Sequence, residues 1–477
     1  MRRFSYCLVI ASLGNAAPGH ADTSSLHFTA TGSVAATDNV FGAPDNGDRE
    51  ADVFTDLKPG VLFAYDTPRI IQELSAAVDL LEYVAHSDQP SVTAYGGWKA
   101  LILSGPRSQV LVGADGGTGE LNAIVTRTGA DQTTVVVTPT AATQPISLRQ
   151  ADGSEGLSWQ SGKQSRLAQN AFVSWAATDD NAKMPTTTDA IQTGMSGTLE
   201  GDLHGDAVAL TAGATYLRLE RIAPGPPGTL MGSDLDREIN PNANLTWRHD
   251  INKKWSFDAT GGVIYVDPVG TDPYAPTAVR RSSWNPTFGG VLAYIDVWGR
   301  ATFAAAHSVA PNLLMAENAV DTNAIAQVSL PLPWLDNTTS RSPKLVGSGT
   351  LGFDHSQLLD AATGANDATF DVVRLDASVA YTPRMGETFA VRYQLLYQRP
   401  EGSGSMAALL APTYYSNTLF FTFSYMYPDR IREARVPLRS EAVRADRSDL
   451  VPGGDEPVVP DAAEQQPDAE DSSGDQR

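Results

Sequence analysis

Apolar and polar residues alternate with a period of two over most of the chain between Leu26 and Tyr427. From Trp255 to Tyr265 every second residue is aromatic, aliphatic, alanine or glycine, and the residues between them are mainly small or polar. Successive side chains of a β-strand point to opposite sides, so this pattern indicates strands with one apolar and one mainly polar face. We find no comparable stretch with a sustained helical period, which makes the chain all-β.

The alternation predicts about 18 strands. The expected strands cover residues 26–36, 52–65, 70–83, 91–103, 108–121, 146–159, 167–177, 189–201, 207–219, 241–249, 255–266, 286–295, 299–308, 322–332, 344–355, 370–381, 387–398 and 414–427. The least defined region is 122–145, where Thr133–Thr138 adds or shifts a strand.

The connections between these strands alternate in length. Links after even-numbered strands are mostly short, as in Asp66–Arg69 and Asp250–Lys254. Links after odd-numbered strands are mostly long and polar, as in Thr37–Ala51 and Glu220–Asn240. The segment Pro333–Pro343 is the main exception, because its position calls for a short turn. Short turns at one end and long loops at the other are typical of bacterial outer-membrane barrels.

We therefore predict a transmembrane antiparallel up-and-down β-barrel over residues 22–428, in the bacterial outer membrane with both termini in the periplasm. Trp255 to Tyr265 spans roughly 23 Å of the membrane normal at ~3.3 Å per residue and ~45° tilt, close to the expected apolar band. A secreted β-sandwich or propeller is the alternative, but neither gives loop length a reason to alternate.

The first residues predict a secretory signal peptide over 1–21. Arg2 and Arg3 precede a short apolar stretch, and Gly19 and Ala21 suit a cleavage site. The one cysteine, Cys7, lies inside this segment, so the mature chain would contain no thiol for disulfides, catalysis or metal binding. With 34 basic and 55 acidic residues the net charge is −21, which argues against a nucleic-acid partner.

The sequence gives no positive sign of an enzyme or of a cofactor or metal site. Its seven histidines are scattered, and none pairs with another at metal-ligand spacing. No Gly-x-Ser-x-Gly motif is present. We expect each histidine to lie in a loop or in the lumen.

If the aromatic face meets lipid, the opposite face lines the lumen. The candidate lumen residues are Glu73, Ser75, Asp79, Asn244, Arg248, Arg300, Thr302, Arg374, Asp376, Ser378, Arg392 and Gln394. A barrel of this strand number is wide enough for an aqueous channel unless it is plugged. The alternative is that these charges only solvate one another inside a closed barrel.

The end of the barrel carries a second set of candidate residues, Leu419, Phe421, Phe423, Tyr425 and Tyr427. They resemble the terminal strand signal that outer-membrane barrels present to the barrel assembly machinery, and they face lipid. Residues 429–477 follow, first rich in arginine and then acidic and interrupted by proline. Such a segment cannot bury enough apolar surface to fold alone. We expect a disordered periplasmic tail, either merely solvated or docked onto a periplasmic export component.

The segment from Thr37 to Phe41, Thr-Asp-Asn-Val-Phe, is followed by Ala51-Asp-Val-Phe-Thr-Asp-Leu-Lys-Pro-Gly60. This region resembles the start of outer-membrane β-barrel families associated with exopolysaccharide biosynthesis and export. The resemblance implies a pore that translocates a secreted polysaccharide. The residues themselves leave two other functions open, a general diffusion porin and a closed structural or binding barrel that works through its loops.

Overall fold

The structure is a computed structural model of the chain, and it describes residues 23–40, 49–87, 90–121, 146–161, 165–178, 187–222, 234–270, 281–296, 298–312, 317–332, 344–359, 366–384, 386–401 and 413–427. The described strands are β1 (Thr23–Thr37), β2 (Asp52–Asp66), β3 (Ile70–Tyr83), β4 (Ser91–Gly105), β5 (Ser108–Leu121), β6 (Ile146–Gln160), β7 (Ser165–Thr178), β8 (Thr187–Leu203), β9 (Asp206–Ile222), β10 (Asp234–Asp250), β11 (Trp255–Pro268), β12 (Ser283–Asp296), β13 (Gly299–Asn312), β14 (Glu317–Pro331), β15 (Leu345–Leu359), β16 (Asn366–Arg384), β17 (Glu387–Glu401) and β18 (Tyr414–Tyr427).

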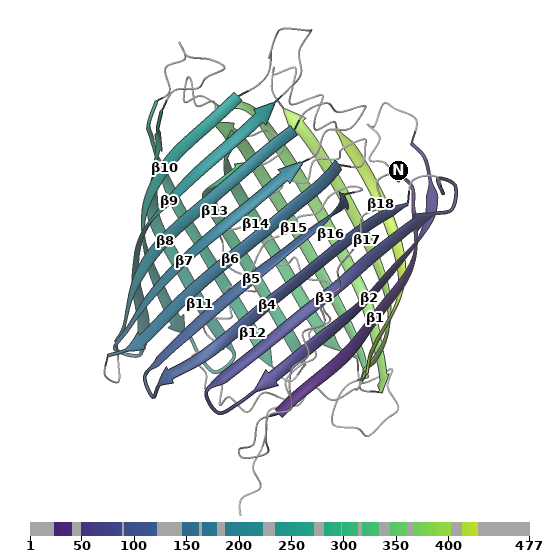
Figure 1. The fold of residues 1–477 in the computed structure, drawn as a ribbon, viewed down its shortest axis with the longest axis horizontal. Coiled ribbons are helices and arrows are strands. Elements are labelled where there is room, and N and C mark those ends of the chain that lie inside the picture. Colours follow the sequence, from purple (N-terminus) through teal and green to yellow (C-terminus); the bar gives the residue numbers. More distant parts are fainter. Residues whose placement is uncertain are drawn as a thin grey trace, which may run out of the picture.

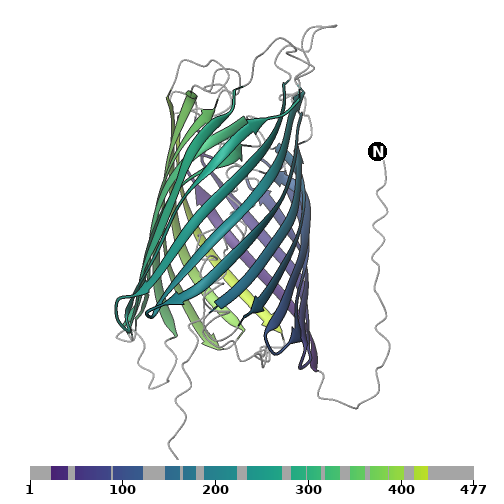
Figure 2. The ribbon, with the colours of Figure 1, turned by 90° about the vertical axis from the view of Figure 1, so that its left-hand side faces the viewer.

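These strands form one closed sheet of 18 strands, each antiparallel to its two neighbours in sequence. The barrel closes where β1 pairs with β18 on one side and with β2 on the other. Figure 1 shows the purple first strand beside the yellow-green last one, and Figure 2 shows the oblique strands of the closed barrel from the side. The prediction of an all-β, antiparallel up-and-down barrel is confirmed.

Contacts between strands that are not neighbours identify the inner face. The Phe54 ring of β2 lies 6.0 Å from the Phe420 ring of β18, across the small Ala35 of β1. Thr287 of β12 donates to Asn244 of β10 across β11. Such contacts form where side chains converge, on the concave side of a barrel. The register then assigns every other residue of each strand to the inner or the outer face.

The predicted alternation of connection lengths is confirmed at the strand ends. β8 and β9 are joined by His204 and Gly205, with φ of 58° and 94°, which suits a two-residue hairpin turn of type I′. The next link, between β9 and β10, runs from 223 to 233. The predicted exception is confirmed too, because residues 332–344 separate β14 from β15 at the short-turn end.

Several strands extend beyond their predicted bounds at the long-loop end. β10 begins at Asp234, where the sequence predicts a loop up to Asn240, and its first residues pair with β9. The predicted signal peptide, region 122–145 and residues 429–477 lie outside the described residues. In the part of the chain that the structure describes, no helix is long and apolar enough to cross a membrane.

Candidate functional site: the barrel interior

The outer face of the barrel carries large apolar side chains that are exposed around the whole circumference. Examples are Phe28 on β1, Leu199 on β8, Trp284 on β12 and Leu351 on β15. Apolar surface on this scale is unusual for a protein surrounded by water. The outer face therefore matches a hydrocarbon environment.

The predicted lipid-facing residues of β18 all lie on this outer face. Leu419, Phe421, Phe423, Tyr425 and Tyr427 are exposed, with Tyr427 at 60%. Phe423 pairs with Phe389 of β17, and their ring centroids are 4.8 Å apart. The position suits a lipid-facing strand, whereas the role as an assembly signal stays a prediction.

The candidate lumen residues of β16 and β17 lie on the inner face and bind one another. Arg392 donates from Nε to Asp376 at 2.6 Å, and Arg374 lies 3.3 Å from Asp354 of β15. Ser378 stands opposite Arg392, and its hydroxyl lies 2.6 Å from that of Ser348. Gln394 stands opposite Asp376 in the same register.

The remaining candidates are distributed around the wall and do not form one cluster. Asp79 lies 3.3 Å from Lys58, and Arg248 donates to Asp258 at 2.9 Å. Thr302 donates to Gln327. By the register Glu73, Ser75, Asn244 and Arg300 share this inner face. Lining of an open path by these residues stays a prediction.

Sequence reasoning named both members of the Arg392–Asp376 pair, but it found one member of several other inner-face pairs and missed the other. The missed partners are Lys58, Asp258, Gln327 and Asp354, and the Arg166–Glu200 pair at 3.8 Å was missed entirely. Each of them is a polar residue at an inward position of a predicted strand. The alternation of apolar and polar residues contains enough information to place these residues on the inner face.

Burial changes along the barrel axis. Toward the long-loop end the inner face of β16 to β18 is apolar and buried, with Val372, Leu396 and Tyr414 in one cluster. At the same end the buried Glu238 of β10 accepts a hydrogen bond from Asn318 of β14, four strands away. Nearer the middle of the strands several inner side chains are exposed. The described interior therefore narrows toward the long-loop end.

Three histidines differ from their predicted places. His307 stacks on the exposed Phe288 with ring centroids 4.7 Å apart, and His249 and His355 also share the outer face by their register. A lumen or loop position is therefore wrong for these three. Among the described residues no group of three or more histidine, cysteine, aspartate or glutamate side chains could hold a metal ion.

The motif that carries the family resemblance joins the first strand to the last. Asp38 accepts hydrogen bonds from the backbone N–H and the side-chain amide of Asn417, both at 2.7 Å. The hydroxyls of Tyr393 and Tyr415 donate hydrogen bonds to the Asn417 side-chain oxygen. Asn39 donates to the Tyr415 carbonyl oxygen. These residues act together as a clasp, the "seam clasp", where the barrel closes.

The second part of the motif begins with an acidic residue that ties the long-loop rim of β2 to the segment after β3. The buried Asp52 accepts from the backbone N–H groups of Val53 and Ala85. His86 bridges Asp52 and Glu50, with each nitrogen 2.8 Å from a carboxylate oxygen. The hydrogen bond to Asp52, together with Glu50, raises the pKa of His86 above its ordinary value.

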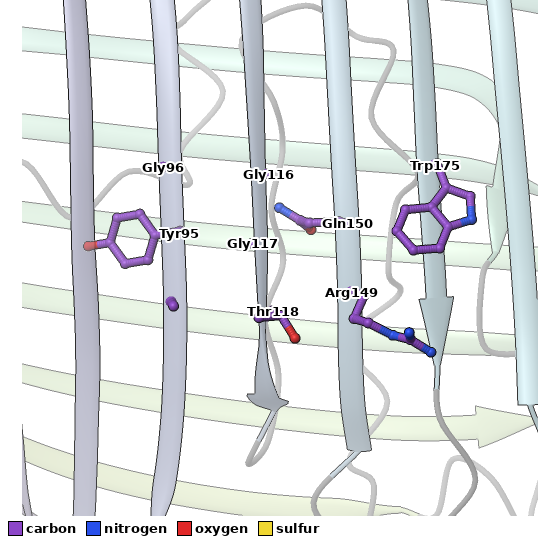
Figure 3. A pocket seen from close by; sticks show the side chains of 9 residues that line it. Tyr95, Gly96, Gly116, Gly117, Thr118, Arg149, Gln150 and Trp175 are labelled. Atoms are coloured by element: carbon purple, nitrogen blue, oxygen red, sulfur yellow. The ribbon is translucent and has the colours of Figure 1, made fainter. Parts of the chain in front are cut away.

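A shallow hollow of about 420 Å³ lies along β4 to β7. Figure 3 shows Arg149 and Trp175 extending from β6 and β7 beside it, with Gly96 and Gly116 on β4 and β5. By the register these four residues belong to the outer face, where the glycines leave room. Tyr95, Gly117 and Gln150 also line the hollow and share the inner face by the same register, so its lining includes residues of both faces.

Comparison with known proteins gives no family: no family model and no curated protein matches the chain. Among solved structures it is similar to OccK2 (OpdF) of Pseudomonas aeruginosa in complex with glucuronate, at 10% identity and a TM-score of 0.43, covering 85% of this chain and 98% of that one. OccAB3 of Acinetobacter baumannii has 9% identity and a TM-score of 0.43, with 85% and 99% covered. The unliganded ferric citrate transporter FecA has 10% identity and a TM-score of 0.44, with 84% and 78% covered. Similarity of this size says nothing about function.

Proposed function

We propose that the protein is a bacterial outer-membrane pore through which small hydrophilic solutes diffuse. The observation that carries this proposal is the contrast between the two faces of one closed barrel. The outer face exposes large apolar side chains around the circumference, and the inner face carries serine, threonine, glutamine and ion-paired charges. A lipid-facing exterior around a polar interior is the arrangement of outer-membrane porins.

The inner wall suits passage rather than tight binding. Its charges are paired across neighbouring strands, as in Arg392–Asp376 and Arg248–Asp258, so they offer hydrogen bonds without one dominant binding site. Conduction needs contacts that are weak and distributed. The buried residues toward the long-loop end narrow the path, which favours small solutes over a polymer.

Conductance in a planar lipid bilayer tests the pore directly. We expect stepwise channels from the purified protein, and a lower conductance from Ser75→Trp, because Ser75 is exposed on the inner face opposite Gly97. Ala76→Trp is the matched control, since the next residue of β3 points to the outer face. Folded protein that produces no channels would contradict the proposal and leave a closed barrel. Equal effects of the two tryptophans would contradict the assignment of faces.

Export of a secreted polysaccharide is the second candidate, supported by the sequence resemblance. Asp38 and Asn39 of that motif bind across the barrel seam, which gives them a structural role whatever the pore transports. A clean deletion strain separates the two functions. Slower uptake of small solutes with intact surface polysaccharide supports the diffusion pore. Loss of surface polysaccharide with unchanged uptake would support export instead.

A further inference from the structure

The inner wall toward the long-loop end contains two buried hydrogen-bond donors that the barrel leaves unsatisfied. Tyr414 of β18 is only 1% exposed, and within the described strands its hydroxyl has no hydrogen-bond partner. The Nε atom of Arg374 on β16 is also buried and has no partner there. A buried polar group without a partner costs free energy, and native structures contain few of them.

These two donors belong to one place on the wall. Tyr414 forms an apolar cluster with Leu396 of β17 and Val372 of β16, and Arg374 is the next inward residue of β16 after Val372. The Arg374 charge acts on the Tyr414 hydroxyl, so the two groups lie close together. Phenylalanine would fill the space of this ring without an unsatisfied hydroxyl. Packing alone therefore does not account for a tyrosine at this position.

A hydrogen-bond acceptor that the interior can reach lies beside these donors. Arg374 binds Asp354 of β15 through a terminal nitrogen at 3.3 Å, and this pair does not use the Nε atom. The Arg374 and Asp354 side chains keep 23% and 33% of their surface exposed. Gly352 stands directly opposite Arg374 and has no side chain to cover the guanidinium. A solute that docks on this pair from the interior therefore lies next to the two unsatisfied donors.

The charges of this part of the wall disfavour an anion. Around Arg374 the inner face carries the charged residues Asp321, Asp354, Asp376 and Arg392. Both guanidiniums already bind a carboxylate, in the pairs Arg374–Asp354 and Arg392–Asp376. Asp321 adds a further acidic group to the same face. What the wall offers a solute is single donors beside a carboxylate acceptor, and a hydroxyl group matches both because it accepts and donates.

We propose that Arg374, Tyr414 and Asp354 form a weak subsite for a neutral sugar. Hydroxyl groups of the sugar accept from the Arg374 Nε and the Tyr414 hydroxyl, and one of them donates to the Asp354 carboxylate. The interior narrows at the apolar cluster that contains Tyr414, so a solute that crosses the barrel passes these residues. A few neutral hydrogen bonds are weak enough for release, as conduction requires. This inference rests on the proposed diffusion pore and deepens it by naming a class of solute.

Block of single-channel KCl currents by glucose tests this subsite. Glucose should lower the wild-type current along a saturating curve, because saturation requires a site. Tyr414→Phe should raise the half-saturating glucose concentration roughly threefold to tenfold, which corresponds to one hydrogen bond. The conductance without sugar should stay unchanged, since the ring keeps its place in the cluster. Tyr397→Phe is the matched control, because Tyr397 of β17 lies on the outer face by the register and loses the same hydroxyl. It should leave the half-saturating concentration unchanged.

A second variant and a charged sugar complete the test. Arg374→Lys keeps the positive charge beside Asp354 but removes the Nε donor, so it should also weaken the block. Glucuronate, which has the same ring with a carboxylate, should block less than glucose. A non-saturating decrease of the current, equal half-saturation in wild type and Tyr414→Phe, or a stronger block by glucuronate would overturn the subsite and leave the pore standing. Folded protein without channels would overturn the pore and this inference together.

Discussion

Glu155 lies on the outer face at a place that conflicts with a hydrocarbon environment. Glu155 of β6 is exposed, and the register places it on the same face as Leu157 and Trp159. It lies about 9 Å above Trp159 along the membrane normal, at ~3.3 Å per residue and ~45° tilt. A carboxylate at that depth is unfavourable in a bilayer, and the cost falls only near the interfaces.

Replacement of Glu155 by leucine should therefore stabilise the barrel, by roughly 1–2 kcal/mol in a lipid bilayer. The measurement is the temperature at which the folded band converts to the unfolded band in a heat-modifiability series in liposomes. Glu155→Gln should give a smaller gain, because the amide remains polar. An unchanged or lower transition temperature would show that the carboxylate has a partner in the membrane.

At the long-loop rim, His86 makes the stability of the segment after β3 depend on pH. Because its pKa in the folded barrel is raised, the protonated form bridging Asp52 and Glu50 contributes stability below the unfolded pKa. That contribution is lost as the pH rises through the raised folded pKa. At mildly acidic pH we expect the Ala85 amide to be better protected from hydrogen exchange in the wild type than in His86→Gln. At alkaline pH we expect the protection of this amide to be the same in the two proteins. A constant difference at every pH would contradict this role.

The assignment of one side of β18 to lipid can be tested by substitution. Phe423 and Tyr427 are exposed on the outer face of β18, and charge there is costly near mid-bilayer. We expect Phe423→Asp/Tyr427→Asp to abolish insertion into the outer membrane. The matched control is Thr422→Asp/Met426→Asp, which alters the neighbouring inner-face positions and should insert. Normal heat-modifiable protein from the outer-face variant would contradict the assignment.

The seam clasp should stabilise the folded barrel at the contact between its first and last strands, β1 and β18. Asp38→Ala removes the acceptor of two charge-assisted hydrogen bonds from Asn417, which are worth roughly 1.5–3 kcal/mol each. We expect a lower transition temperature in the heat-modifiability series, and a smaller decrease in Asp38→Asn, which keeps an acceptor oxygen. If Asp38→Ala is as stable as the wild type, the clasp is not what holds β1 to β18.

At the level of elements, the sequence predicted the parts of strands that face hydrocarbon and missed the parts that extend beyond it. The membrane imposes apolar residues on the outer face, so alternation is strong from Trp255 to Tyr265. The first residues of β10, Asp234–Asn240, form a strand with mainly polar side chains and carry no such signal. Hydrogen bonds to β9 hold them, and pairing between strands leaves little trace in one sequence.

For the whole molecule, the sequence predicted a closed barrel but not what lies within it. Inward positions follow from alternation, and so the candidate lumen residues could be named in advance. The contact between Glu238 and Asn318 joins two strands that are four apart in the sheet, and the apolar cluster around Tyr414 joins the last three strands. The narrowing of the interior depends on these contacts, and alternation contains no information about them.

The closed sheet also predicts which part of the chain is dispensable. β18 ends at Tyr427 and pairs along its length with β1 and β17, so the hydrogen-bonded circuit is complete before the C-terminal segment begins. Gly454–Arg477 is strongly acidic and interrupted by proline, which gives it little apolar surface to contribute to the barrel. Deletion of Gly454–Arg477 should leave heat-modifiability and single-channel conductance unchanged. A loss of the folded band in that truncation would show that the tail is part of the barrel. A changed conductance with a normal folded band would place the tail in the path of the solute.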